Sequence, residues 1–280
     1  MAEAYPDFEL TPEIDARIGE AAGLLREARH VVALTGAGLS VESGIPPFRG
    51  PGGLWTKYGE PPMDGYQRFV ADPKAAWQAR LDPAKEGWRR GLEETLGKAE
   101  PNDGHRALAA LEAAGHLACL ITQNIDGLHG DAGSQRVAEI HGNYALLRCL
   151  GCVTRFPPEA IPVDPADLPP RCPDCGGMLK GDTVQFGEPI PQDVLRRCFE
   201  EVARCDVMLV AGTSATVFPA ADFPMEVLRG GGAVIEVNPL PSELTRVATV
   251  ALQGPGGEVL TRLLDHVSRP TTARARENRA

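Results

Sequence analysis

The chain has 280 residues, 43% of them hydrophobic, and its 28 lysine and arginine residues face 38 aspartate and glutamate residues. The net charge of −10 argues against a nucleic-acid-binding surface, which would be basic. No apolar run reaches about 18 residues, so we expect no membrane-spanning segment. The acidic first seven residues lack an apolar core, which predicts no signal peptide and a cytoplasmic location. Seven cysteines in such a chain favour metal binding or buried thiols over disulfides.

The first predicted elements are a helix and a buried strand. Residues 11 to 29 predict a helix, because Thr11 can cap it, Pro12 suits its first position and apolar residues recur every three or four positions. Residues 31 to 35 are apolar and β-branched, as in a buried parallel strand. Glycines at positions 36 and 38 follow at once, and such a turn brings backbone N–H groups to a phosphate in α/β folds.

The stretch from Gly36 to Gly50 predicts a dinucleotide site of an unusual type. Arg49 supplies a permanent positive charge that suits a pyrophosphate. The third glycine of the dehydrogenase fingerprint would fall at Val41, and no acidic residue follows where a ribose ligand is expected. We therefore expect a dinucleotide without hydride transfer, and an ordinary turn between strand and helix is the alternative.

Residues 50 to 104 predict a loop and a small helical insertion. The glycine-rich residues 50 to 55 predict a mobile loop, and long irregular segments in compact domains are often functional lids. Prolines divide the rest into short pieces, in which Trp77 and Trp88 are expected core residues.

Three further strands are predicted to end in small or polar residues. They cover residues 117–121, 207–211 and 233–237, and ligands of open α/β sheets bind beyond such carboxyl ends. Together with Gly36, these ends predict a nucleotide cleft, although Asn124 or Asp126 could instead cap a helix. The remaining predicted elements are helices at 105–115, 192–204, 219–229 and about 258–267, an extended segment at 183–186, a possible strand at 247–252 and a polar tail at 271–280.

Four cysteines give the strongest chemical signal in the chain. Cys149 and Cys152 form one CxxC pair, and Cys172 and Cys175 form a second pair after 19 intervening residues. Two such pairs predict a tetrahedral zinc ribbon, and four cysteine ligands leave no open position, so the zinc would be structural. His141, before Gly142, lies between this motif and the polar residues at 122–129, which makes it a candidate base.

These motifs together resemble the sirtuin family, the NAD-dependent protein-lysine deacylases, in its bacterial or archaeal type. The resemblance covers about residues 25 to 265. It rests on residues 36–50, on residues 122–126, on His141-Gly142, on the two CxxC pairs, on Phe186-Gly187-Glu188 and on residues 212–214.

The resemblance implies an α/β fold: a Rossmann-like doubly wound parallel sheet with a small inserted zinc-ribbon and helical domain. The large NAD-binding domain would comprise residues 1–48, 105–142 and 187–267. The small domain would comprise residues 49–104 and 143–186, and residues 268–280 would form a tail. NAD and an acyl-lysine peptide would enter the cleft between the domains.

The resemblance also implies residue roles. The acyl oxygen would attack C1′ of the nicotinamide ribose, nicotinamide would leave, and His141 would act as general base on a ribose hydroxyl that takes the acyl group. Asn124 is the second implied catalytic residue, and residues Val184, Gln185, Phe186, Gly187 and Glu188 would pair with the peptide by strand addition. The implied cofactor-binding residues are Gly36, Ala37, Gly38, Ser40, Ile45, Pro46, Phe48, Arg49, Trp55, Gln123, Asn124, Ile125, Asp126, Gly212, Thr213, Ser214, Asn238, Pro239 and Gly256, and the implied zinc ligands are the four cysteines.

Some positions depart from the family pattern. Pro47 replaces a frequent acidic residue, which could alter hydrogen bonding in the cofactor loop, and Gly181 replaces a proline before the peptide-binding segment. A Tyr-x-x-Arg that selects acidic acyl groups is absent, because the corresponding positions hold Arg80 and Pro83. We therefore expect succinyl-lysine and malonyl-lysine to be disfavoured.

Three other functions compete with deacylation. NAD-dependent ADP-ribosyl transfer to a protein would use the same cleft. A nucleic-acid-binding or scaffold protein built on the zinc ribbon is opposed by the acidic charge and by few aromatic residues in the ribbon. A dehydrogenase is opposed by Val41. The expected partners are acylated proteins or peptides, and nothing in the sequence requires an oligomer, so a monomer is plausible.

Overall fold

The computed structural model describes residues 8–50, 52–82 and 88–269. The predicted tail at 271–280, Pro83, Pro51 of the predicted mobile loop and the side chain of Trp88 lie outside this description. None of the helices in the described ranges is long and apolar enough to cross a bilayer.

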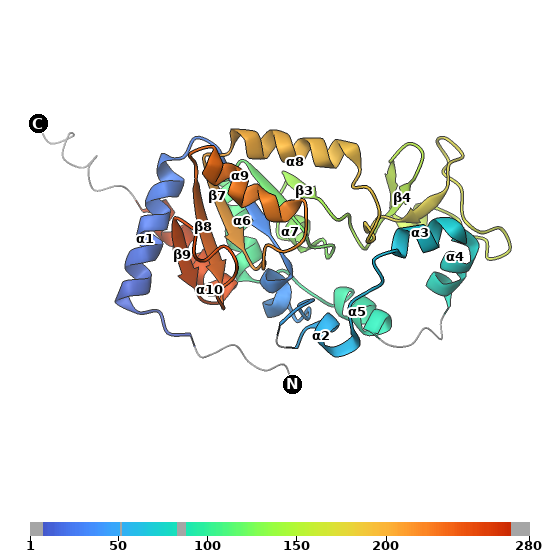
Figure 1. The fold of residues 1–280 in the computed structure, drawn as a ribbon, viewed down its shortest axis with the longest axis horizontal. Helices are drawn as coiled ribbons and strands as arrows, with labels where there is room; N and C mark the ends of the chain where they lie inside the picture. The colour runs from blue at the N-terminus through green and yellow to red at the C-terminus, as the bar shows by residue number, and fades with distance from the viewer. Residues whose placement is uncertain (1–7, 51, 83–87, 270–280) are drawn as a thin grey trace, which may run out of the picture.

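A six-stranded parallel sheet organises the larger part of the molecule (Figure 1). Its strands are β1 (Val31–Thr35), β2 (Cys119–Thr122), β3 (Val137–Glu139), β7 (Val207–Ala211), β8 (Ala233–Asn238) and β9 (Val250–Gln253). The strand order is β3-β2-β1-β7-β8-β9. The chain therefore changes direction across the sheet between β1 and β7, and in doubly wound folds a crevice opens beyond the strand ends at that point. This arrangement confirms the predicted Rossmann-like sheet.

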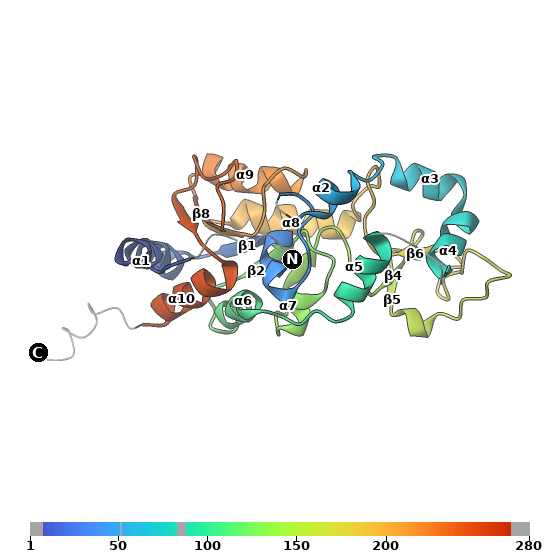
Figure 2. The same cartoon turned by 90° about the horizontal axis from the view of Figure 1, so that it is seen from below.

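Helices cover both faces of this sheet, and Figure 2 shows the three layers. On one face lie α1 (Pro12–Glu27), α6 (Asp103–Ala113) and α10 (Gly256–Ser268), and on the other lie α8 (Gln192–Arg204) and α9 (Phe223–Arg229). The sheet is buried between them, which is why β1 and β7 are apolar at nearly every position. As predicted, Thr11 caps α1, and its hydroxyl accepts a hydrogen bond from the Ile14 N–H at 3.3 Å.

A second, smaller sheet lies beside the first sheet's carboxyl ends (Figure 1). Strands β4 (Leu147–Cys149), β5 (Arg155–Phe156) and β6 (Leu179–Gly181) pair antiparallel in the order β5-β4-β6. Helices α3 (Gly65–Ala71) and α4 (Pro73–Leu81) pack on it, and the buried Trp77 donates from Nε1 to the Leu179 carbonyl at 2.9 Å. The prediction that Trp77 is a core residue of the insertion is therefore confirmed. The last helix of the insertion is α5 (Trp88–Leu96).

The structure differs from the predicted elements at several places. The glycine-rich residues after β1 form a short 3₁₀ helix, η1 (Ala37–Ser43), which Gly44 ends at φ 85°. Residues 183–186, predicted to be extended, have no strand pairing: a bend at residues 182–183 and a turn at residues 186–187 flank irregular residues 184 and 185. The single helix predicted at 219–229 is divided into η3 (Ala220–Asp222) and α9, and β9 begins at Val250 instead of 247. The short elements β3 and α7 (Leu128–Asp131) were not predicted, because three or four residues carry too little periodicity. The remaining short helices are α2 (Leu54–Tyr58) and η2 (Pro158–Ala160).

Candidate functional site

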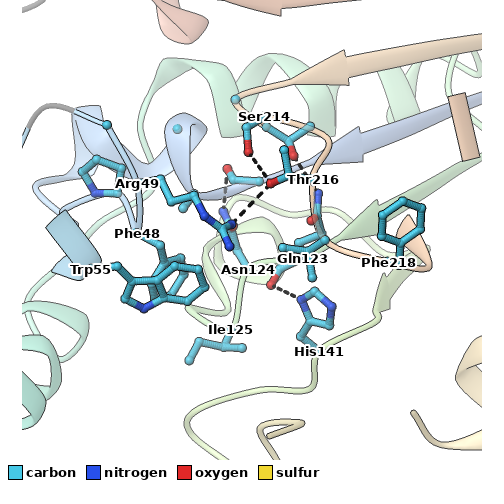
Figure 3. Close-up of a pocket in the computed structure, with 18 of the residues that line it drawn as sticks. Phe48, Arg49, Trp55, Gln123, Asn124, Ile125, His141, Ser214, Thr216 and Phe218 are labelled. Atoms are coloured by element: carbon cyan, nitrogen blue, oxygen red, sulfur yellow. Dashed lines mark hydrogen bonds between the residues drawn. The ribbon is translucent and has the colours of Figure 1, made fainter. Parts of the chain in front are cut away.

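A cavity of about 760 Å³ opens at the carboxyl ends of β1, β2, β7 and β8, as Figure 3 shows in close-up. All four predicted strand ends, Gly36, Gln123, Gly212 and Asn238, line it. Segments from the loop after η1, from residues 183–188 and from residues 238–243 complete its wall. The volume lies in the range that small-molecule and cofactor sites occupy.

Glycines form the floor where β1 and β7 end. A Cβ on Gly36 would lie 2.7 Å from the Thr213 Cβ, and a Cβ on Gly38 would lie 2.8 Å from the Gly212 carbonyl oxygen. The Gly38 N–H donates to that carbonyl at 2.8 Å. Side chains at these positions would push the two backbones apart, so the glycines keep the floor narrow and free of side chains. A dinucleotide phosphate can then approach the backbone closely, as in other Rossmann-type sites.

Arg49 supplies the permanent positive charge of the cavity. Its guanidinium lies 4.3 Å from the centre of the Trp55 ring and donates to the Thr216 hydroxyl at 3.3 Å (Figure 3). Glu60 lies 3.8 Å away. Arg49 therefore reaches across the cavity from the loop after η1 to the loop after β7, and a guanidinium in this place could bind a pyrophosphate in bidentate fashion.

Aromatic rings connect the loop after η1 to the segment at 183–188. The ring centres of Phe48 and Trp55 are 5.2 Å apart, and those of Trp55 and Phe186 are 5.8 Å apart. Trp55 lies in α2, at the end of the predicted mobile loop. This aromatic wall makes one side of the cavity apolar.

Asn124 is held from behind the cavity. Its Nδ2 donates to the Gly36 carbonyl at 3.1 Å and to the Ser40 hydroxyl at 3.0 Å. Ser40 in turn donates to Asp126 at 2.7 Å, and Asp126 accepts from the Leu128 N–H at 3.0 Å. Burial raises the pKa of Asp126. The N-cap of α7 is Gly127 instead of Asn124 or Asp126, and Asp126, which does not line the cavity, holds Ser40. Asn124 therefore reaches the cavity in a fixed orientation.

His141 lies at the edge of the same cavity. Its Nδ1 is 3.1 Å from the Gln123 carbonyl oxygen, so Nδ1 carries the proton and Nε2 keeps its lone pair. Burial lowers the pKa of His141, and the hydrogen bond to Gln123 opposes that change. A neutral imidazole with a free Nε2 can accept a proton from a hydroxyl in the cavity.

Most predicted site residues line the cavity, and five lie behind its wall. The five are Ser40, Ile45, Pro46, Asp126 and Gly256. Ser40 and Asp126 support Asn124, Ile45 is buried, and Gly256 packs against Leu39 of η1. The cavity wall includes all five predicted peptide-binding residues, 184 to 188, which pair with no other strand in the structure.

The contacts of Pro47 and Gly181, the two departures from the family pattern, show what each residue does in the structure. The Pro47 carbonyl accepts from the Leu54 N–H at 2.8 Å, so this residue helps to close the cofactor loop. A Cβ on Gly181 would lie 2.9 Å from Arg80 Nη1, and the Arg80 guanidinium lies 5.8 Å from the centre of the Trp77 ring. Glycine at 181 therefore makes room for Arg80, which is directed at β6 and does not line the cavity.

Several residues of the wall were not predicted from the sequence. They are Pro61, Thr183, Ile190, Thr216, Val217, Phe218 and residues 240–243. Residues 216–218 come one position after Gly212, Thr213 and Ser214, so they belong to the same strand-end loop. Phe218 is 68% exposed at the mouth of the cavity.

The four cysteines of the two CxxC pairs meet in one cluster. Their sulfur atoms all lie within 4.8 Å of one another, and two of the pairs are 3.4 Å and 3.7 Å apart. Sulfur atoms at about 2.3 Å from a tetrahedral zinc are about 3.8 Å apart, so the cluster fits one ion. Backbone N–H groups of Gly151, Cys152 and Gly177 also point at these sulfurs, as expected for thiolates. The residues are therefore placed to hold a single structural zinc.

A family model and named relatives both match this chain. A family model described as the Sir2 family matches residues 36–219. The NAD-dependent protein deacylase 1 of Archaeoglobus fulgidus is 45% identical over 243 residues, which cover 87% of this chain and 95% of the relative. The NAD-dependent protein deacylase 2 of Pyrobaculum aerophilum is 44% identical over 248 residues, covering 89% of this chain and 95% of the relative.

Solved structures agree with these relatives. A mutant Sir2 homologue in complex with ADP-ribose has a TM-score of 0.74 at 42% identity, covering 93% of this chain and 98% of that chain. A Sir2 homologue in complex with NAD has a TM-score of 0.71 at 43% identity, covering 89% of this chain and 93% of that chain.

Proposed function

The chain belongs to the Sir2 family, and we propose that it removes acetyl or other acyl groups from protein lysines in an NAD-dependent reaction. Relatives over 40% identical are named NAD-dependent protein deacylases. One solved neighbour is a Sir2 homologue in complex with NAD, and another is a Sir2 protein with a p53 peptide and NAD. The products would be nicotinamide, O-acyl-ADP-ribose and free lysine.

The observation that carries this proposal is the position of His141. Its free Nε2 lies at the edge of a cavity whose wall combines a glycine floor, Arg49 and residues 183–188. We call residues 183–188 the peptide-type segment, because most of them would pair with the peptide. Bound NAD supplies the ADP-ribose group that accepts the acyl group. His141 would take the proton of the attacking hydroxyl, and the carbonyl of Gln123 would stabilise the imidazolium that results.

Other residues would bind and orient the substrates. Arg49 and the backbone at Gly36, Ala37 and Gly38 would bind the pyrophosphate, while Asn124 would bind at the nicotinamide end. Thr213, Ser214 and Asn238 would line the adenosine half. The aromatic wall of Phe48, Trp55 and Phe186 would exclude water from the reacting centre.

The division into domains is part of the same proposal. The large domain would comprise residues 1–48, 105–142 and 187–267, and the small domain residues 49–104 and 143–186. The separate cores of the two sheets support it. A cytoplasmic location is proposed as well, and the seven cysteines support it, because none of them forms a disulfide in the structure.

The direct test is incubation of the purified protein with an acetyl-lysine peptide, with and without NAD. Peptide mass and nicotinamide release are followed together. Loss of acetyl that needs NAD and matches nicotinamide release is the expected result. Nicotinamide release without loss of acetyl would instead favour ADP-ribosyl transfer or NAD hydrolysis.

A further inference from the structure

Five charged residues form a cluster behind the cavity wall at residues 183–188. The side chains of Arg148, Asp182, Glu188 and Lys180 are at most 5% exposed, and that of Arg155 is 31% exposed. We call these five residues the buried ionic cluster. Ion pairs join Arg148 to Asp182 at 2.8 Å and to Glu188 at 2.6 Å, Lys180 to Glu188 at 3.1 Å, and Arg155 to Asp182 at 3.0 Å.

Stability alone does not account for this cluster. Desolvation of buried charges costs about as much as their pairing returns, and apolar side chains of similar volume often serve as well or better. Such a cluster instead fixes the positions of the chain segments that carry it, because each buried charge is stable only next to its partners. The residues that it touches therefore indicate its role.

One side of the cluster holds the segment at 183–188. Lys180 Nζ donates to the carbonyls of Gly181 and Thr183, each at 2.7 Å. Glu188 accepts from the Gln185 N–H at 2.9 Å and closes the turn with a backbone bond to the Gln185 carbonyl at 3.0 Å. The segment has no strand pairing of its own, so these contacts with Lys180 and Glu188 hold its backbone in place.

The other side of the cluster holds the backbone of His141. Asp182 accepts from the Asn143 N–H at 2.9 Å, and the Val184 N–H donates to the His141 carbonyl at 2.8 Å. Gly142, at φ 78°, leaves no room for a Cβ against the Asp182 carbonyl. The chain that directly follows His141 is therefore clamped to Asp182, and the His141 carbonyl is held by Val184.

Arg148 connects the two sides, since it pairs with both Asp182 and Glu188. It lies on β4 next to Cys149, so it belongs to the small sheet that the cysteine cluster supports. Through this residue, the small sheet contacts both the peptide-type segment and the backbone of the candidate base.

We propose that the buried ionic cluster positions two parts of the site separately: Lys180 and Glu188 set the backbone that pairs with the acyl-lysine peptide, and Asp182 sets the position of His141. This inference rests on the proposed deacylase function. Lys180 and Asp182 are positioning residues, since neither lines the cavity.

The proposal predicts that two substitutions in one cluster have different kinetic effects. Lys180→Met removes two hydrogen bonds from a charged group, one to the Thr183 carbonyl of the peptide-type segment and one to the Gly181 carbonyl just before it. KM for the acetyl-lysine peptide therefore rises by about tenfold or more. KM for NAD stays within about twofold, because Lys180 touches nothing on the cofactor wall. Asp182→Asn shifts His141, and kcat falls by about 100-fold, as for a base displaced by about 1 Å.

Two further variants separate positioning from stability. The double variant Lys180→Met, Glu188→Gln removes one positive and one negative charge. Arg148 and Arg155 still pair with Asp182, so no charge in the cluster is left unpaired. The unfolding temperature should therefore stay near that of the wild type. The raised peptide KM should persist. Asp15→Asn is the matched control, because Asp15 pairs with Arg262 and His266 where α1 meets α10, away from the cavity. It should lower the unfolding temperature and leave both KM values unchanged.

Peptide affinity, measured by fluorescence anisotropy of a labelled acetyl-lysine peptide, distinguishes the possible failures. A wild type that binds the peptide without NAD-dependent turnover contradicts the proposed function, while weaker binding by folded Lys180→Met still supports the cluster's role. Unchanged peptide KM and affinity in folded Lys180→Met overturn the proposal. Equal losses in peptide KM and in kcat for Lys180→Met, Asp182→Asn and Asp15→Asn overturn it too.

Discussion

The Nδ1 atom of His141 and the carbonyl oxygen of Gln123 are 3.1 Å apart, and this contact determines which imidazole nitrogen can act in the cavity. Gln123 directly follows β2, so the rigid central sheet fixes the ring. Because Nδ1 carries the proton, Nε2 is the basic atom. This relationship makes the role of His141 testable by substitution and by pH.

Substitution of His141 should abolish deacylation and spare the fold. His141→Ala removes the base, and losing a positioned general base costs about 10² to 10⁴ in rate. Loss of acetyl from the peptide, followed by mass spectrometry, should fall by that factor, while thermal unfolding changes little. A variant that no longer removes acetyl but still transfers labelled ADP-ribose to protein would favour the alternative function.

The pH dependence of the reaction should show the lowered pKa of His141. Burial lowers this pKa, so the imidazole stays neutral to a lower pH than an ordinary histidine, whose pKa is about 6.5. The acid limb of kcat/KM should therefore lie below about pH 6.5, with activity decreasing as pH falls through the lowered value. Activity should return after samples go back to pH 7.5. An acid limb above neutral pH contradicts the assignment.

Zinc removal should inactivate the protein through its small sheet. The cysteine cluster joins the hairpin after β4 to residues 172–175, and the core that packs around it has few buried apolar side chains. A thiol reagent should release about one zinc per chain, measured with a colorimetric chelator. Deacylation should decline in step with release, because β4 and β6 carry Arg148 and Lys180.

A matched control for the zinc experiment is Cys205→Ala. Cys205 is buried in the core of the large sheet, where burial raises the pKa of its thiol to about 12. This variant should keep its zinc and its activity, whereas Cys172→Ser should lose both. A zinc-free protein that deacylates at the wild-type rate would show that the metal has no part in holding the site.

Acid should destabilise the fold through His105. This side chain is fully buried, and burial, followed by the nearby charge of Arg106, lowers its pKa to about 4. Below about pH 6.5 the unfolded chain binds a proton that the folded chain accepts only near pH 4, so the free energy of unfolding falls across this range. The expected decrease is about 3 kcal/mol.

Denaturant unfolding from pH 7 to pH 4.5 measures most of this loss. Wild type should lose stability as pH decreases, and His105→Gln should lose distinctly less over the same range, whatever its stability at pH 7. Its remaining slope should include His129, because burial also lowers the pKa of that histidine. Equal slopes in the two proteins would exclude His105 as a source of the acid sensitivity.

The sequence predicted those parts of the site that depend on local spacing. The CxxC pairs placed four sulfurs together, and the residues after Thr35, Ile121, Ala211 and Val237 reached one cavity because parallel strands share an edge. Contacts between distant segments were not predictable in this way. Arg148 and Glu188 are 40 positions apart and meet only because β4 pairs with β6, and Arg80 occupies the space at Gly181 through packing of α4. The irregular path of residues 183–186 likewise depends on these buried contacts.

Acidic acyl groups should be poor substrates. Among the cavity-lining residues that the structure describes, Arg49 is the single permanent cation, and its charge is stacked on Trp55 with Glu60 at 3.8 Å. Arg80, which the family resemblance places at the tyrosine position of the acid-selective motif if Trp77 is the motif's tryptophan, is directed at β6 instead of the cavity. A carboxylate on the acyl chain would therefore enter an apolar, aromatic wall without a partner, which is costly.

Acetyl and succinyl versions of one peptide, compared by mass spectrometry at equal NAD, measure this preference. The kcat/KM for the acetyl peptide should exceed that for the succinyl peptide by about tenfold or more, since an unpaired carboxylate in an apolar site costs more than about 1.4 kcal/mol. A butyryl peptide is the matched control, because it adds chain length without charge and should be processed far better than the succinyl peptide. If succinyl removal is the faster reaction, a cation must reach the acyl group, and Arg80→Met would then identify whether that cation is Arg80.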